Sequence, residues 1–426
     1  MAGFAVTIAA YRPGLLTFDS ILQFGQSQRG LYWDHHPPVM AWTWGMTHRV
    51  IPGPLGMLLL QAALMWLGLL LFADGAARRG FRHGWIIVAI GFLPPVIGIE
   101  GEIWKDVQMA AALLFAAGVV YRASAGGKGI GGIAAVLSLI ALFYATAVRA
   151  NAPAATGPIL VYWAHHVFRR LSWRASVLAG AAALTLLLGA QWIFDNTFLH
   201  VEHVYLSQFL EIHDIAAIQC AGGDASIPAS KQRAAACARP LCEAFDPLQV
   251  DFLFAGPEAP LAATTDAQAI DALGREWRRA IAANPVLYLR HRLRVFGALL
   301  GEGVDDARRW VWIPSSIANV YGFTFAPNAI TDAIGVGVGA ALALGLYNGM
   351  LWLAAALAVL VAAARRMHRD RQSDAAALAL STSAITYTLP YFLVAVAPDY
   401  RYLYWTIIAT AVGAVLSMLP ARRISR

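Results

Sequence analysis

The sequence predicts an all-α polytopic membrane protein with about ten transmembrane helices, interfacial helices and one mostly helical external loop module. The first observation is composition: of the 426 residues, 59% are hydrophobic and 13% are charged, and the mean hydropathy is +0.57. Soluble domains carry about 25% charged residues. The second observation is that apolar runs close to the thickness of a bilayer recur along the chain. The basic residues fall in short loops between these runs, and no nucleic-acid-binding motif occurs, so nucleic acid is not an expected partner.

The apolar runs define ten expected spans, in the segments 1–16, 54–76, 85–99, 104–122, 129–148, 152–168, 175–195, 342–364, 375–396 and 402–420. The first run is shorter than the roughly 20 residues that cross a bilayer. It also lacks the basic start and the cleavage site of a secretory signal. Segments 38–50 and 286–300 are apolar but too short or too rich in arginine to span, so we expect them to lie at the membrane surface.

Basic residues cluster in alternate loops, and this pattern predicts the orientation of the chain. Cytoplasmic loops carry the excess of lysine and arginine, so these loops and both termini are expected in the cytoplasm, with the other loops in the periplasm. Arginine outnumbers lysine and alanine is abundant, which indicates a bacterial protein and therefore a bacterial inner membrane. The clusters are Arg78, Arg79 and Arg82; Arg122 and Lys128; Arg169, Arg170 and Arg174; Arg365, Arg366, Arg369 and Arg371; and Arg422, Arg423 and Arg426.

The expected topology divides the chain into three parts. Residues 1–195 form an N-terminal membrane bundle whose first external loop, 17–53, holds the chemistry. Residues 196–340 form an external module, and residues 341–426 supply the C-terminal transmembrane helices.

All three cysteines lie in the external module. An oxidising compartment permits a disulfide, and three cysteines predict one bridge and one free thiol. A bridge between Cys237 and Cys242 closes a tight loop, and a bridge from Cys220 to either of them is the alternative.

The first external loop concentrates polar side chains beside a membrane boundary. It contains Asp19 and, further on, Asp34, His35 and His36, which precede a Pro-Pro pair. Charged groups held close to a membrane are costly and therefore indicate a functional site. Asp19 is either the N-cap of the short helix that follows it or a general base that accepts a proton from a hydroxyl group. The two histidines belong either to a structural turn, which Pro-Pro favours, or to the same site.

The other external turns also carry charge, although several are too short to need it for solvation. A single arginine at an outer helix end is usually a snorkelling side chain beside an aromatic anchor. The presence of charged or amide groups in every external turn of the bundle favours a common site, in which lysine and arginine bind phosphate. The residues concerned are Glu102, Lys105, Asp106, Arg149, Asp399, Tyr400 and Arg401.

These motifs resemble those of the polyprenyl-phosphate-sugar-dependent, multi-spanning glycosyltransferases of the GT-C type, which include protein O-mannosyltransferases and lipid A aminoarabinose transferases. That family has an acidic residue just after its first helix and a basic or histidine residue before Pro-Pro in the same loop. Three features depart from the family: the first helix is short, the external module lies between the seventh and eighth helices, and no DxD motif occurs, which leaves use of a divalent metal open. The matching stretches are Leu16-Thr17-Phe18-Asp19-Ser20, His36-Pro37-Pro38, Trp104-Lys105-Asp106 and Pro398-Asp399-Tyr400-Arg401-Tyr402.

The resemblance implies transfer of a sugar, with inversion, from a polyprenyl-phosphate donor to a hydroxyl group at the external face. The acceptor would be an envelope glycolipid, a polysaccharide or a protein. Asp19 would be the catalytic base, and Lys105, Arg149, Arg401 and His36 would bind the donor phosphate. The supporting residues would be Asp34, His35, Glu102, Asp106, Asp399 and Tyr400.

Two other functions remain open from the sequence. A polysaccharide polymerase or ligase would use a polyprenyl-diphosphate donor, and more arginines at the outer surface would fit it. A lipid-linked transporter or flippase would place polar residues deep inside the spans, where this chain has few and mild ones.

Overall fold

The computed structural model describes residues 1–126, 130–168, 170–232, 239–367 and 373–419. Within these ranges the chain is 70% helical and contains no β-strand, which confirms the predicted helical fold class. Several residues named above lie outside the described ranges, namely Lys128, Arg169, Cys237, Arg369, Arg371, Arg422, Arg423 and Arg426.

The helices follow one another with short connections in the first half of the chain and longer ones in the second half. In chain order they are α1 (Ala2–Tyr11), α2 (Phe18–Arg29), α3 (Val39–Val50), α4 (Leu55–Arg78), α5 (Trp85–Ala89), α6 (Pro94–Glu100), α7 (Lys105–Ala123), α8 (Gly132–Ala147), α9 (Ala152–Val167), α10 (Trp173–Ile193), α11 (Ser207–Cys220), α12 (Leu241–Ala244), α13 (Ala267–Ala283), α14 (Pro285–Leu299), α15 (Ala329–Ala343), α16 (Gly349–Arg366), α17 (Ser373–Thr388), α18 (Tyr391–Val394) and α19 (Tyr404–Ser417).

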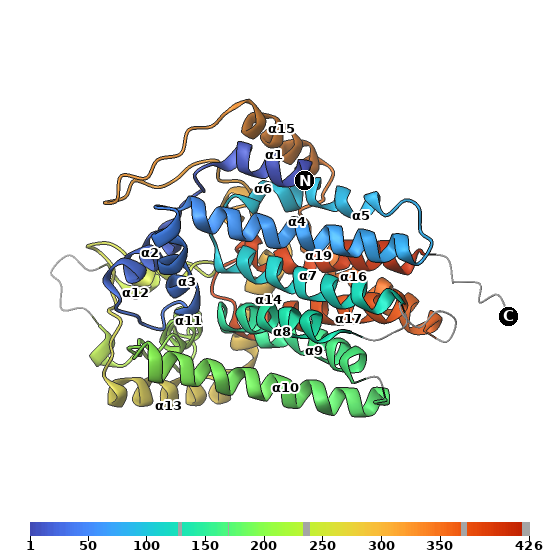
Figure 1. Ribbon diagram of the computed structural model, residues 1–426. Coiled ribbons are helices and arrows are strands. Elements are labelled where there is room, and N and C mark those ends of the chain that lie inside the picture. The colour runs from blue at the N-terminus through green and yellow to red at the C-terminus, as the bar shows by residue number, and fades with distance from the viewer. Residues whose placement is uncertain (127–129, 169, 233–238, 368–372, 420–426) are drawn as a thin grey trace.

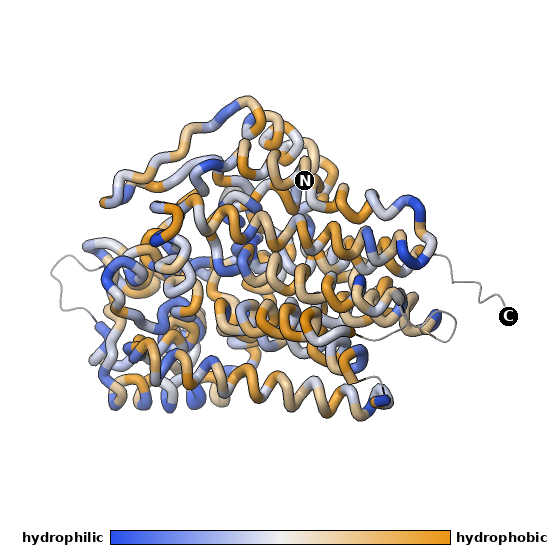
Figure 2. Tube along the Cα trace, viewed as in Figure 1, coloured by the Kyte–Doolittle hydropathy of each residue, from blue (hydrophilic) through white to orange (hydrophobic). Residues whose placement is uncertain are grey.

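The long apolar helices lie side by side and form a bundle, and the more hydrophilic segments gather over its left-hand end and in the loops at its right-hand end (Figures 1 and 2). This arrangement of apolar helices is the one expected of a helical membrane protein. The apolar helices α1, α8 and α15 are shorter than the spanning length, so the number of spans established in the described part of the chain is below the predicted ten. Five helical segments are long and apolar enough to cross a membrane: Leu55–Arg78, Lys105–Ala123, Trp173–Phe198, Gly349–Arg366 and Asp374–Val394.

The span predicted at 85–99 is interrupted. The segment forms α5, a turn of 3-10 helix and then α6, which begins at Pro94 and Pro95. Proline has no N–H to donate, and it suits the first turn of a new helix rather than the middle of an old one. The segment therefore consists of two short helices.

The span predicted at 342–364 also begins later than expected. Gly345 adopts a left-handed φ of 72°, which ends α15, and the Asn348 side chain accepts a hydrogen bond from the Met350 N–H at 2.9 Å to cap α16. The preceding helix α15 packs against α1, where the Thr331 hydroxyl donates to the Ala10 carbonyl at 2.8 Å. Part of the range predicted as external module therefore packs on the membrane bundle.

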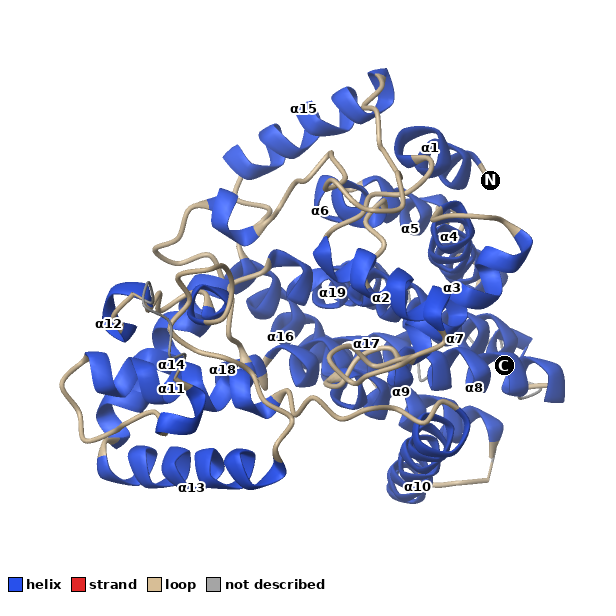
Figure 3. Ribbon diagram, turned by 90° about the vertical axis from the view of Figure 1, so that its left-hand side faces the viewer, coloured by secondary structure: helices blue, strands red, loops and turns tan. Residues whose placement is uncertain are grey.

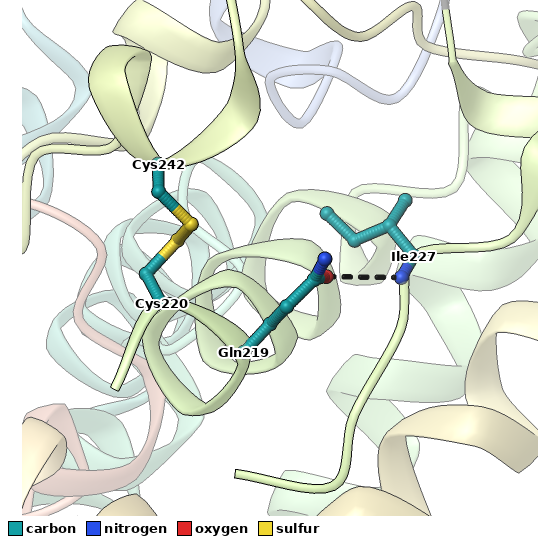
Figure 4. Close-up of a disulfide and its surroundings, with 4 residues drawn as sticks. All are labelled: Gln219, Cys220, Ile227 and Cys242. Carbon is teal, nitrogen blue, oxygen red and sulfur yellow. Dashed lines mark hydrogen bonds between the residues drawn. A yellow bond between two sulfur atoms is a disulfide. The ribbon is translucent and has the colours of Figure 1, made fainter. Parts of the chain in front are cut away.

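Helices α11, α13 and α14 form a second, smaller core beside the bundle. Seen from the left-hand side of Figure 1, α4 and α10 are viewed nearly end-on, whereas α13 lies across the view (Figure 3). A disulfide joins Cys220, at the end of α11, to Cys242 in α12 (Figure 4). Since Cys242 is bonded to Cys220, the pairing of Cys237 with Cys242 that a tight loop suggested does not form.

A fully buried ion pair attaches this smaller core to the C-terminal helices. Asp214 of α11 pairs with Arg292 of α14, and both side chains have 0% exposure. Arg292 also donates to the Ala395 carbonyl at 2.6 Å, just after α18, and the Trp277 indole donates to Asp214 at 2.8 Å. The Asp214 carboxylate and the Arg292 guanidinium therefore each bind partners from two different segments of the chain.

Candidate functional site

Asp19 lies in the first turn of α2, close to the loop between α6 and α7. The N-cap of α2 is Thr17, whose N–H donates to the Ser20 hydroxyl at 3.2 Å. The Ser20 hydroxyl in turn donates to the Ile103 carbonyl at 2.9 Å. The capping alternative for Asp19 is therefore wrong, and its carboxylate is available for other partners.

The main partner of Asp19 is Arg401, which arrives from the far end of the chain. The Arg401 guanidinium donates to Asp19 at 2.6 Å and to Asp399 at 2.9 Å. It also lies over the ring of Trp104, 4.9 Å from the centroid. Arg401 lies in the turn of 3-10 helix that leads into α19, and in Figure 3 this helix is seen behind α2 near the centre of the view.

His36 lies between Asp19 and Lys105. Its Nε2 is 3.5 Å from Asp19 and its Nδ1 is 2.6 Å from the Lys105 Nζ. Burial, followed by the charge of Lys105, lowers the pKa of His36 to about 3, so the ring is neutral at physiological pH. A neutral ring that accepts from the ammonium at Nδ1 must carry its proton on Nε2, where it faces the Asp19 carboxylate. Lys105 is thus hydrogen-bonded to His36, and the other side of the His36 ring faces the Asp19 carboxylate at the longer distance of 3.5 Å.

These contacts determine the protonation of Asp19. Burial alone would raise the pKa of this carboxyl group, but Arg401, His36 and Lys105 together hold it well below its usual range. In contrast, burial outweighs Arg401 at Asp399 and raises its pKa. Asp19 is therefore an ionised carboxylate with Arg401 bound to one oxygen atom and His36 close to the other.

Asp106 and Arg149 form the adjoining part of the site. Their side chains are 2.5 Å apart and are 0% and 8% exposed. Arg149 also donates to Asn151 and to the Tyr391 hydroxyl, each at 2.7 Å, and it lies over the ring of Tyr402. Asp106 comes within 4.0 Å of Arg401 and so connects the Asp106–Arg149 pair with the group around Asp19. We call the set Asp19, His36, Lys105, Asp106, Arg149, Asp399 and Arg401 the charged cluster.

Four predicted supporting residues lie outside the charged cluster. Asp34 binds His203 at 2.8 Å and the Val204 N–H at 2.7 Å, so it fixes the loop after α10. The His35 ring packs edge-on against His36 and Phe209. The other two are the buried Glu102 and Tyr400.

Glu102 and Tyr400 have structural surroundings. Burial raises the pKa of Glu102 well above its usual value, although Arg401 acts against this shift, so the side chain is a neutral acid. The Tyr400 hydroxyl donates to the Pro95 carbonyl at 3.4 Å and its ring lies beside Arg309.

Two aromatic residues of the site were not among the predicted site residues. Tyr391 and Tyr402 stack on each other with ring centroids 4.9 Å apart, and Arg149 lies against them. Tyr402 was part of a recognised motif, and Tyr391 was concealed in an apolar run. Tyr387 and Tyr391, four residues apart in an otherwise apolar run, were the available signal, and the Tyr391 hydroxyl donates to that of Tyr387 at 3.0 Å.

The charged cluster sits at the opposite end of α7 from the basic loop that follows α4. α7 begins with Lys105 in the cluster and ends near Arg122, which pairs with Asp74 at the end of α4. In the part of the chain that the structure describes, no set of three histidine, cysteine, aspartate or glutamate side chains is arranged to hold a metal ion. Comparison of the chain with protein-family models, with curated proteins and with solved structures found no match.

Proposed function

We propose that this protein is a membrane glycosyltransferase that moves a sugar from a polyprenyl-phosphate donor to an acceptor hydroxyl at the end of the bundle that holds the charged cluster. The observation that carries the proposal is Asp19, an ionised carboxylate held between Arg401 and the His36–Lys105 pair. A base and several cations within reach of one another are what this reaction requires.

In the proposed step the acceptor oxygen bonds to the anomeric carbon as the bond from that carbon to the phosphate oxygen breaks. The leaving phosphate keeps the electron pair, and the hydroxyl proton passes to Asp19. A single displacement inverts the configuration at the anomeric carbon. General base catalysis of this kind contributes roughly 10²–10⁴-fold in rate.

Arg401 links donor binding to the basicity of Asp19. While Arg401 holds Asp19 at 2.6 Å, the carboxylate is a weak base because its pKa is well below the usual range. A donor phosphate that engages Arg401 removes part of this hold and makes Asp19 a stronger base. Lys105 and Arg149 then stabilise the charge on the departing phosphate.

The test is donor turnover by wild type and Asp19→Asn, purified in lipid and incubated with a panel of polyprenyl-phosphate sugars and a crude envelope-lipid acceptor. Mass spectrometry follows loss of the donor and release of polyprenyl phosphate. The matched control is Asp34→Asn, since Asp34 is an acid of the same loop that pairs outside the cluster. Wild type and Asp34→Asn should consume one donor, and Asp19→Asn should lose at least about 100-fold in rate.

The outcomes separate the alternatives. Equal turnover by Asp19→Asn would assign the base elsewhere and refute the role of Asp19. If every monophosphate donor stays intact while a polyprenyl-diphosphate donor is consumed, the polymerase or ligase function replaces the one proposed.

A further inference from the structure

A pocket lies between α2 and α3, away from the charged cluster. It has a volume of about 300 Å³, and its lining includes Arg29, Tyr32, Trp42 and Arg49. Asp19 and Arg29 stand at opposite ends of α2, ten residues apart, which at 1.5 Å per residue is about 15 Å. The pocket is therefore a separate site.

The two arginines of this pocket differ from the cations of the charged cluster. Both are exposed, and among the residues that the structure describes neither has an acidic partner. Arg149 and Arg401, in contrast, are almost buried and each is paired with a carboxylate. Two guanidinium groups beside one pocket without a counterion favour an anionic ligand that binds through oxygen atoms.

The surroundings place the pocket at the level where a membrane meets water. Trp42 packs edge-on against Phe194 with ring centroids 5.2 Å apart, and Phe194 lies in the last turns of the candidate span Trp173–Phe198. In the same turns, Trp192 and Phe198 are 65% and 70% exposed. Aromatic side chains at the end of a span are typical of the membrane interface.

Exposed aliphatic side chains stand next to both arginines. Leu31 follows Arg29 by two residues and is 61% exposed, and Val50 follows Arg49 directly and is 81% exposed. A cation with an aliphatic neighbour suits the boundary between headgroups and acyl chains, where the apolar group enters the hydrocarbon and the cation meets phosphate.

We propose that this pocket binds the phosphate headgroup of an anionic membrane lipid, with Arg29 and Arg49 as its cationic ligands and Leu31 and Val50 inserted beside the acyl chains. The proposal does not rest on the proposed function, because it uses no residue of the charged cluster. It gives the first external loop a lipid contact that fixes α2 against the membrane surface.

The test is native mass spectrometry of the full-length protein in detergent, titrated with phosphatidylglycerol. The variant Arg29→Gln/Arg49→Gln removes both cations from the pocket. The control Arg275→Gln/Arg278→Gln removes two exposed arginines from α13, which is remote from the pocket. Each basic contact with an anionic headgroup contributes roughly fivefold to binding, so the pocket variant should bind phosphatidylglycerol about 25-fold more weakly and the control should match wild type.

A third variant, Leu31→Ser/Val50→Ser, separates a lipid from free phosphate. It keeps both cations, so it should weaken binding of phosphatidylglycerol, and excess inorganic phosphate should displace little lipid from wild type. Full displacement by inorganic phosphate would assign the pocket to a soluble phosphate and overturn the lipid proposal. Unchanged lipid binding in the pocket variant would also overturn it, and would leave the arginines only as cations at the C-terminal ends of α2 and α3.

Discussion

The substitution Arg401→Gln tests whether the charged cluster is held together by its ion pairs. It leaves Asp19 and Asp399 without the cation that contacts them at 2.6 and 2.9 Å. Removing one partner of a buried ion pair costs about 3–5 kcal/mol. Because Arg401 and Asp19 keep 14% and 21% exposure, water offsets part of this cost, and we expect a loss of about 3 kcal/mol in the free energy of unfolding at neutral pH.

The assay is equilibrium unfolding in mixed micelles, followed by tryptophan fluorescence. The matched control is Arg279→Gln, since Arg279 also contacts two carboxylates, Asp224 at 2.9 Å and Glu276 at 2.8 Å, but lies on the exposed surface of α13. The control should change stability far less, because exposed ion pairs are screened by water.

The pH dependence gives a second readout with a defined sign. In the wild type the pKa of Asp19 is held well below its usual range, so the stability that its ion pair contributes is present above that range and is lost as the pH falls through the lowered value. In Arg401→Gln the cation no longer opposes burial, which raises the pKa of both carboxyl groups above the usual value of about 4, so they take up protons as the pH falls from 7 toward 4. The difference between variant and wild type should therefore shrink as the pH is lowered from 7 to about 4. A difference that stays constant over this range, or equals that of Arg279→Gln, would refute the ion-pair argument.

Three further predictions concern other parts of the molecule. Arg292→Met should destabilise the smaller core by about 3–5 kcal/mol, because it leaves the fully buried Asp214 without its cation. The double variant Arg292→Met/Asp214→Leu should recover most of that loss in urea unfolding, and no recovery would contradict the ion-pair explanation. Burial lowers the pKa of His213 to about 4 and that of His291 to about 2. The free energy of unfolding should therefore fall as the pH drops below about 6.5, by up to about 1.4 kcal/mol per pH unit for each histidine. His213→Gln should reduce this slope in acid-unfolding curves, and an unchanged slope would contradict the role of His213. Cys220→Ser should lower the stability of the smaller core by about 2–4 kcal/mol, measured by limited proteolysis of the segment after α11, and equal cleavage of variant and wild type would contradict that role.

The apolar pattern was sufficient to predict most of the helices. α4 and α7 carry long apolar runs with no helix breaker, so their bounds lie close to the expected 54–76 and 104–122. The pattern was less informative at 85–99 and 342–364. There Pro94 and Gly345 introduce local backbone preferences that end a helix without altering the average hydropathy of the segment.

The sequence also indicated which residues gather at one end of the bundle, since helix order alone brings the external turns to one side. It did not indicate the partners within that end. Asp19 is 382 residues from Arg401, and the choice of Arg401 rather than Arg149 as its partner depends on where the turn before α19 meets the first turn of α2. Asp34 was expected in the same site and instead binds His203, because the loop after α10 passes beside it. Such contacts depend on tertiary packing and leave no periodic signal in the chain.

The separation of Asp19 from Arg401 also affects how the protein is made. A ribosome that adds about 5–20 residues per second needs about 20–80 s to synthesise the 382 residues between them. During that interval Asp19 has been synthesised and Arg401 has not, so the first loop lacks this ion pair and is less stable. A chain that stops before Arg401 keeps that form permanently. Synthesis of Arg401 is thus the step that stabilises the first loop, and in a truncated product the segment that carries Asp19 lacks its counterion.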